Sequence, residues 1–332
     1  MQGTLIGGLI VGILFGFLLQ RTRMCFNSAI RDVRYFKDNW LWKQGLMAIA
    51  VETIGFQLMA AMGAIKLNPS AFIPAAQIVG GFAFGMGMVL AGGCASGVTY
   101  RIGEGNVLGI IAATFYALFA GAARNGKLKS VTALFGKPIT VTMENPGVYA
   151  AKDGKVAPTV ANLLGIDPWI VAIVFALILL AYLFFTKTSE RKAPMHWTIG
   201  GILIGLVGML AYWSNQTYSL GITGGWINLF TATLTDAPYN WIGMEVFGII
   251  VGAFISALIF KEFKIRFPKD PKAYVQAVIG GALMGWGAGV AGGCNIGHFL
   301  SGVPHLAISS LLATAFFILG NWFMYWMLYG RD

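Results

Sequence analysis

Charge is the property that this sequence has least of. Asp, Glu, Lys and Arg make up only 11% of the 332 residues, whereas 57% are hydrophobic. A soluble globular domain carries roughly 25% charged residues, so the deficit excludes a soluble fold. Windows of about 20 mostly apolar residues, the length that crosses a bilayer as a helix, recur along the whole chain. The composition therefore predicts an all-α polytopic membrane protein.

Cysteine and histidine are also scarce, with three of each. The cysteines Cys25, Cys94 and Cys294 show no Cys-x-x-Cys spacing, which argues against a disulfide framework and against a metal site. The chain also lacks the Gly-x-x-x-x-Gly-Lys-Ser/Thr pattern of ATP-hydrolysing proteins. We therefore expect no metal, no cofactor and no built-in ATPase.

Nine apolar segments are long enough to cross a membrane, and they predict a single membrane domain. Some stretches between them, notably 94–105 and 294–304, are moderately apolar and rich in glycine. Such stretches are typical of short helices and loops that re-enter the bilayer from one face. The nine spans lie at about 3–20, 41–63, 72–92, 106–123, 168–186, 196–214, 241–261, 274–293 and 305–329.

The basic residues predict how the chain is oriented. The net charge is +10, but Lys and Arg flank the apolar spans, so we assign them to orientation beside membrane lipids and not to nucleic acid. Because nine spans alternate in direction, 16 of the 23 basic residues fall on one side. The positive-inside rule makes that side cytoplasmic, which places the N-terminus outside and the C-terminus inside.

The sequence contains an internal repeat with two offsets. Residues 79–97 and 279–297 agree at nine of 19 positions, and earlier segments agree at a shorter offset that pairs Glu52 with Glu245. At the offset of 200 the shared residues are Gly80, Gly81, Gly85, Gly87, Ala91, Gly92, Gly93, Cys94 and Gly97. At the offset of 193 they include Ile6, Gly7, Gly8, Gly12, Glu52 and Gly55.

This repeat divides the chain into two halves of four spans each. We expect the first repeat at about 3–123, a connector with a long polar loop and one span at about 124–195, and the second repeat at about 196–329. Because five spans precede the second repeat, the two halves should lie upside down relative to each other. Inverted repeats with broken helices are a transporter design with the substrate site near the midplane.

The motif Ala-Gly-Gly-Cys ends an apolar span at 91–94 and again at 291–294. Gly-Gly followed by more glycine favours a helix break, and the free N–H groups of a helix that restarts there provide a place for an anion. The inverted relation would let the two thiols approach each other across the midplane. A lone buried cysteine usually only fills space, and close helix packing is the competing interpretation of the glycines. The duplicated motif supplies these candidates for a substrate path: Gly92, Gly93, Cys94, Gly292, Gly293 and Cys294, with the neighbouring Asn295.

Cys25 lies within Arg21-Thr-Arg-Met-Cys-Phe-Asn-Ser-Ala-Ile-Arg31, and its repeat counterpart is Tyr218. Its position among arginines on the cytoplasmic side suggests an exit site for an anion. The alternative is an incidental thiol beside residues that anchor the chain. Arg101, which follows the first Ala-Gly-Gly-Cys motif, is likewise either a ligand for an anion or an interfacial anchor.

Glu52 and Glu245 lie inside apolar spans, where a carboxyl group is costly and needs a partner. A negative charge would repel an anionic substrate. We therefore expect both to support the structure by accepting backbone N–H bonds from a re-entrant loop. Coupling to protons is the alternative.

At the Ala-Gly-Gly-Cys pair and the Arg-Met-Cys-Phe-Asn stretch, the sequence resembles the YeeE/YedE sulfur-transport family of bacterial inner-membrane proteins. The resemblance covers essentially the whole chain. It implies an hourglass-like fold pinched by re-entrant loops, and import of thiosulfate along a cysteine relay at Cys25, Cys94 and Cys294. It also implies a small cytoplasmic TusA-like sulfur-carrier protein as receiver. A neutral thiol is a weak donor that can meet the soft sulfur of a dianion, so we expect the thiols to stay protonated.

Other functions remain open on the sequence alone. Some relatives are linked to selenium, so another sulfur or selenium oxyanion is an alternative substrate. A thiol-dependent membrane sulfurtransferase acting with a soluble sulfur carrier is the enzymatic alternative, and a membrane anchor for a soluble partner is a third. No activating His or Asp partner is evident beside Cys25 or Cys94. We therefore expect a transporter and not an enzyme, and assign no catalytic residue.

Overall fold

The structure, a computed structural model, describes residues 3–142, 147–191 and 193–330. Nine helices in these residues are long and apolar enough to cross a membrane, and they lie where the sequence predicted nine spans. The spanning helices are α1 (Leu5–Thr22), α3 (Trp40–Ala61), α4 (Pro74–Leu90), α6 (Val107–Arg124), α9 (Pro168–Phe185), α10 (Trp197–Asn215), α12 (Trp241–Ile259), α13 (Pro271–Ala291) and α14 (Ile308–Tyr329). An all-α polytopic membrane fold is therefore confirmed.

Short elements fill the glycine-rich stretches between the spans. They are α2 (Phe26–Arg31) with the π-helical turn Asp32–Phe36, α5 (Ala95–Gly103), α11 (Thr223–Leu234), the π-helical turn Ile296–Leu300 and the 3-10 turn Val303–His305. The long connection after α6 contains α7 (Lys129–Ala133), α8 (Val160–Leu164) and an antiparallel pair of two-residue strands, β1 (Val141–Thr142) and β2 (Lys155–Val156).

Several helices begin where the sequence supplies a cap. Asn106 accepts a hydrogen bond from Gly109 N at 3.2 Å, and Asn240 accepts one from Gly243 N at 3.0 Å. Asp270 does the same for Lys272 N at 2.9 Å. These side chains satisfy N–H groups that the first turn of a helix leaves free. Within a membrane protein this matters because hydrocarbon offers no substitute partner.

Glycines allow the spans to touch backbone to backbone. A Cβ atom added to Gly85 of α4 would collide with the Phe317 carbonyl of α14. One added to Gly285, the repeat counterpart on α13, would collide with the Tyr116 carbonyl of α6. Lipid tails are as apolar as the side chains, so close packing of small residues is a main source of helix association in a membrane. The repeated glycines are therefore contact points between helices.

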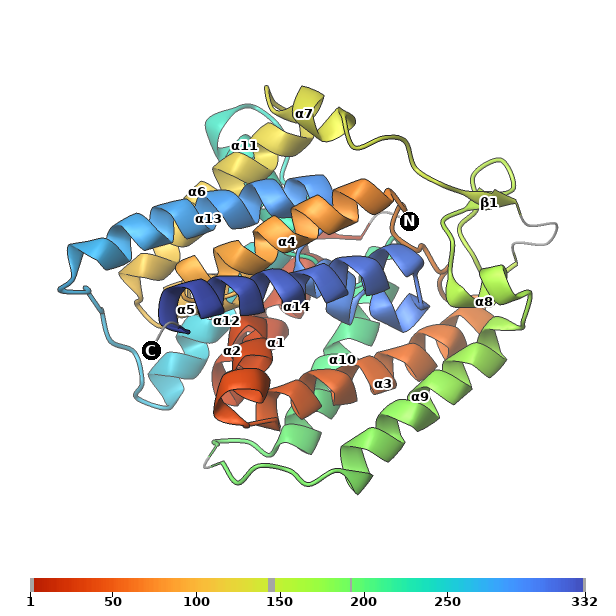
Figure 1. The fold of residues 1–332 in the computed structure, drawn as a ribbon, viewed down its shortest axis with the longest axis horizontal. Helices are drawn as coiled ribbons and strands as arrows, with labels where there is room; N and C mark the ends of the chain where they lie inside the picture. The colour runs from red at the N-terminus through yellow and green to blue at the C-terminus, as the bar shows by residue number, and fades with distance from the viewer. Residues whose placement is uncertain (1–2, 143–146, 192, 331–332) are drawn as a thin grey trace.

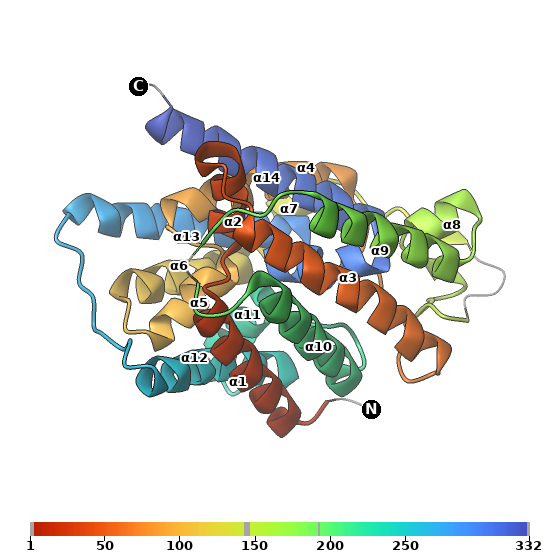
Figure 2. The ribbon, with the colours of Figure 1, turned by 90° about the horizontal axis from the view of Figure 1, so that it is seen from below.

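The two halves of the chain pair their helices in the same way. α1 packs along α12, and α10, which begins the second half, packs along α3. α6 packs along α13, and α14 packs along α4. Figure 1 shows α4 between α13 and α14, and Figure 2 shows α1 between α12 and α10. Exchanging the halves therefore reproduces the set of helix contacts.

The long connection after α6 and the connection between α12 and α13 lie at opposite ends of the molecule (Figure 1). The first is tied down by its backbone. Leu67 N donates to Val148 O at 2.9 Å, and Ile308 N donates to Pro158 O at 3.0 Å. In Figure 2, α1 begins at the lower edge of the helical bundle and α14 ends at its upper edge.

Candidate functional site

Both Ala-Gly-Gly-Cys segments turn at the first glycine of the pair. Gly92 and Gly292 have φ angles of +68° and +90°, in the left-handed region that favours glycine. An arginine donates to the carbonyl of each: Arg101 Nη1 to Gly92 O and Arg124 Nη2 to Gly292 O, both at 2.6 Å. Arg124 was not predicted, because the two arginines hold no equivalent places in the repeat and only the fold brings them to equivalent carbonyls.

Cys94 caps the N-terminus of α5. Its sulfur accepts hydrogen bonds from Gly97 N at 3.4 Å and from Phe26 N at 3.3 Å. Phe26 is the first residue of α2, whose N-terminal capping position is occupied by Cys25. The first turns of α2 and α5 therefore meet at one sulfur atom, and the positive ends of both backbone segments face it.

The two cysteines at these caps are in contact. Cys25 Sγ and Cys94 Sγ lie 3.7 Å apart, and the two residues are 1% and 0% exposed. The sequence suggested that Cys94 would approach Cys294, but the thiol that lies against it is Cys25. This difference arises because α2 packs inside the helical bundle. The arginines on both sides of Cys25 in the sequence did not indicate this packing. Cys25 and Cys94 therefore form a pair of buried thiols in contact with each other, here called the closed thiol pair.

Gly97 provides the space for this pair. A Cβ atom at Gly97 would lie 2.7 Å from Cys25 Sγ, whereas one at its repeat counterpart Gly297 would meet no atom within 4 Å. Gly97→Ala is therefore expected to displace the Cys25 side chain and to lower the free energy of unfolding by about 1–3 kcal/mol, while Gly297→Ala has a smaller effect. Thermal unfolding of the two purified variants checks this. Equal melting temperatures for the two variants would show that the space at Gly97 does not matter.

A cavity of about 400 Å³, here called the Cys294 cavity, opens onto the second motif. Arg124 gives it a positive charge, and the Tyr116 hydroxyl shares a hydrogen bond of 2.7 Å with the hydroxyl of Thr223, which lines the cavity. Burial raises the pKa of the Tyr218 hydroxyl, which lines the same cavity. Other lining residues that bear on an anion are Gly292, Gly293 and His298.

A second cavity, of about 360 Å³, lies at the C-terminal end of α5. Four arginines line it together with one carboxylate, and it is here called the arginine cavity. The lining includes Arg23, Arg101, Glu104, Arg191 and Arg266. The arginine cavity is lined from the last turn of α5 and from the segments that follow α1, α5, α9 and α12, whereas the Cys294 cavity is lined from the ends of α3 and α6. Because successive spans cross the membrane in alternating directions, the two cavities open on opposite sides of the membrane.

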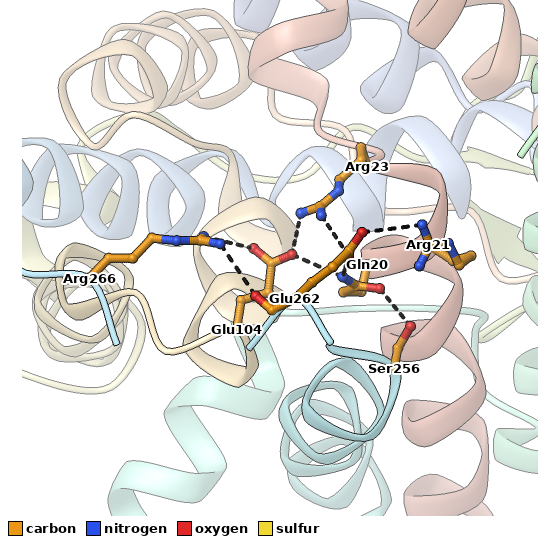
Figure 3. A network of polar contacts seen from close by, with 7 residues as sticks. All are labelled: Gln20, Arg21, Arg23, Glu104, Ser256, Glu262 and Arg266. Atoms are coloured by element: carbon orange, nitrogen blue, oxygen red, sulfur yellow. Dashed lines mark hydrogen bonds and ion pairs between the residues drawn. The ribbon is translucent and has the colours of Figure 1, made fainter. Parts of the chain in front are cut away.

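A polar network beside the arginine cavity ties three helices together (Figure 3). Glu104 accepts hydrogen bonds from Arg23 and from Gln20 Nε2, the latter at 3.2 Å, and pairs with Arg266 at 3.7 Å. Glu262 pairs with Arg23 at 2.7 Å. Partial burial alone would raise the pKa of Glu262, but the Gln20 hydrogen bond and the nearby arginine charges outweigh it and lower the pKa.

The two carboxyl groups inside the spans differ in their surroundings. Glu245 Oε1 accepts a hydrogen bond from Gly221 N at 3.1 Å, in the segment that leads into α11. Both oxygens of Glu52 lack a hydrogen-bond partner among the described residues, and this carboxyl group packs against Gly208. The buried side-chain amide of Asn295, next to Cys294, also has no partner within the described part of the chain.

A bundle of membrane-spanning helices with two polar cavities, one lined by Cys294 and the other by four arginines, is typical of a membrane transport protein. The family described as Sulphur transport matches residues 21–323, and the chain belongs to this family.

Two relatives match over almost their full length. The chain is 50% identical over 331 residues to the thiosulfate transporter TsuA of Spirochaeta thermophila. This match covers 98% of this chain and 99% of that protein. It is 32% identical over 343 residues to the thiosulfate transporter TsuA of Escherichia coli, covering 100% of this chain and 96% of that protein. A shorter match, 30% over 128 residues, joins it to the probable transporter YedE of Escherichia coli, over 38% and 32% of the two chains.

Proposed function

We propose that this chain imports thiosulfate across a bacterial inner membrane, from the Cys294 cavity past the closed thiol pair to the arginine cavity. The observation that carries the proposal is the contact between Cys25 and Cys94 at 3.7 Å, at the N-terminus of the helix whose C-terminal end lines the arginine cavity. The two full-length relatives that are named thiosulfate transporters support the choice of substrate.

The proposed orientation follows from charge. The arginine cavity lies on the side that holds most basic residues, which is the cytoplasmic side under the positive-inside rule. The N-terminus is then outside and the C-terminus inside. The matching helix contacts of the two halves support an inverted repeat made of residues 3–123 and 196–329.

The thiols suit the passage of a dianion because they bind it weakly. Backbone N–H groups of Phe26 and Gly97 donate to the Cys94 sulfur, and its own proton can turn from Cys25 or Ser96 toward a passing sulfur atom. Weak sites in sequence allow an ion to leave as well as to bind. In this cysteine relay, Cys294 receives the anion from the cavity, Cys94 holds it at the centre, and Cys25 passes it on.

The neighbouring residues have supporting roles in this proposal. Arg101 holds the turn at Gly92, and Glu245 holds the segment at Gly221. Glu52, without a hydrogen-bond partner in the described residues, is the candidate for a proton-carrying group, and Asn295 offers a free amide beside Cys294. A small soluble TusA-like sulfur carrier is the proposed receiver at the cytoplasmic mouth.

Transport without bond cleavage is the favoured chemistry. Among the described residues, the groups that form hydrogen bonds with the Cys25 and Cys94 thiols are backbone N–H groups, Ser96 and the other thiol. A cysteine nucleophile is usually activated by a neighbouring base such as histidine, and these contacts supply none. We therefore propose that thiosulfate crosses intact.

Uptake by the purified protein in liposomes tests this function. We expect labelled thiosulfate to accumulate above the level of empty liposomes, and unlabelled thiosulfate to compete better than sulfate or selenite. If none of these anions enters, a self-sufficient transporter is excluded. If selenite or sulfate competes better, the proposed substrate is wrong and the class is kept.

A further inference from the structure

Glu104 occupies an unfavourable place for a carboxylate. It follows the last residue of α5, where the backbone carbonyls concentrate partial negative charge. Its side chain is only 3% exposed, so water stabilises it little. Its charge is balanced instead by Arg23 and Arg266 and by the Gln20 amide. The carboxylate is therefore held by the arginine cavity and not by the helix that carries it.

Arg23 and Arg266 lie where an anion would arrive after it has passed the closed thiol pair. Arg23 precedes Cys25 by two residues, and Arg23, Arg266 and Glu104 all line the arginine cavity. Cys94 caps the first turn of α5 and Glu104 follows its last turn, so this one helix joins the thiol pair to the cavity. The Glu104 carboxylate thus sits among the cations that a small oxyanion would need.

We propose that the arginine cavity is an oxyanion-binding site and that Glu104 is its tethered competitor. In the resting state the Glu104 carboxylate occupies Arg23 and Arg266. An arriving dianion displaces the carboxylate from these guanidinium groups, and the return of the carboxylate expels the dianion toward the mouth. That the dianion is thiosulfate rests on the proposed function, whereas the site itself recognises the sulfonate-like oxygens that any such oxyanion shares.

The chemistry of the cavity supports this exchange. Guanidinium groups bind carboxylate and sulfonate-like oxygens in the same forked geometry, so the two anions compete for the same donors. Arg23 also pairs with Glu262 at 2.7 Å, so it stays in place while Glu104 leaves. Arg191 pairs with Asp32 and Asp38, and Arg101 donates to the Gly92 carbonyl. Arg23 and Arg266 are therefore the cations that Glu104 occupies. If both faced a dianion without this carboxylate they would hold it tightly, and a carrier must release as well as bind. Glu104 keeps the affinity low enough for release.

The test compares variants that change one charge without much change of shape. Glu104→Gln removes the competitor, Arg266→Gln removes a cation whose side chain is 43% exposed, and Glu190→Gln is a matched control at an exposed site outside both cavities. Binding of labelled thiosulfate to the purified protein is measured at physiological salt, where distant surface charges are screened. Sulfate, with the same charge, is the second probe.

We expect Glu104→Gln to lower the Kd for both anions about tenfold, as removal of one competing charge from a partly buried arginine site would. Arg266→Gln should raise the Kd, and Glu190→Gln should leave it unchanged. In liposomes Glu104→Gln should lower both KM and kcat for thiosulfate, because the anion is bound more tightly and released more slowly. A purely structural role would lower kcat without lowering KM.

Unchanged or weaker binding in a folded Glu104→Gln variant would overturn the inference. If that variant does not fold, the Arg266→Gln variant decides, because an unaltered Kd there shows that the cavity binds no oxyanion. The result for the oxyanion site can be read separately from the result for thiosulfate transport. If the wild type fails to take up thiosulfate but the Kd values for sulfate keep the expected order, the oxyanion site stands without the transport assignment.

Discussion

Replacing Cys94 with alanine is expected to abolish thiosulfate uptake while leaving the protein folded. The change removes a sulfur that accepts two backbone N–H bonds and contacts Cys25. Two buried N–H groups then lose their acceptor, at a cost of about 1–3 kcal/mol each, and the central site of the relay disappears. We expect the uptake rate to fall more than about tenfold, because the anion loses its central site, whereas the lost hydrogen bonds act on stability and not on the rate.

The variant Cys94→Ser separates two reasons for this loss. A serine oxygen keeps an acceptor for Phe26 N and Gly97 N but replaces the soft sulfur by a harder and more strongly hydrated atom. Uptake that stays low in Cys94→Ser shows that the sulfur itself is needed. Ser130→Ala, a small change at an exposed position of α7, is the control and should transport at the wild-type rate. Wild-type uptake by Cys94→Ala would remove the relay from the account.

Gly285→Leu is expected to prevent assembly of the bundle. A Cβ atom at this position would meet the Tyr116 carbonyl of α6 and would lie 3.0 Å from Ala120 N. These are backbone atoms of a neighbouring span and cannot move aside as a side-chain end can. Overpacking of a tight core costs about 1–3 kcal/mol for extra methylenes, and a clash with a second backbone adds to this. We expect little folded protein after size-exclusion chromatography in detergent.

Gly121→Leu on α6 is the matched control for this effect. A Cβ atom at Gly121 would meet no atom within 4 Å, so the same change meets open space there. Replacing a helical glycine stabilises the helix by roughly 0.5–1 kcal/mol, and the control should therefore yield at least as much protein as the wild type. Equal losses in both variants would mean that the added side chain, and not the contact between α6 and α13, is responsible.

The spans could be predicted from the sequence because the length and hydropathy of a segment are local properties. The turns at Gly92 and Gly292 could be anticipated for the same reason, since Gly-Gly at the end of an apolar run favours a break. The repeated glycines Gly85 and Gly285 both contact the backbone of a neighbouring span, and such contact excludes every larger residue.

The partners of the site residues could not be predicted in this way. The contact between Cys25 and Cys94 joins residues 69 positions apart, and it depends on how α2 and α5 pack. Arg124 belongs to the end of α6, and nothing in its local sequence connects it to Gly292. Glu104 and Arg266 carried no recognisable spacing either. Long-range pairs of this kind are set by the packing of several helices and leave no periodic pattern along the chain.

Uptake of thiosulfate labelled separately at each of its two sulfur atoms tests the central claim most directly. If the ion passes the thiol pair intact, both labels enter liposomes at the same rate and in equal amounts, and both rates fall together in Cys94→Ala. If the protein instead transfers the terminal sulfur to a thiol, that label stays on the protein or enters alone, while the other sulfur remains outside as sulfite. Equal entry of both labels is the result that the account predicts, and their separation would contradict it.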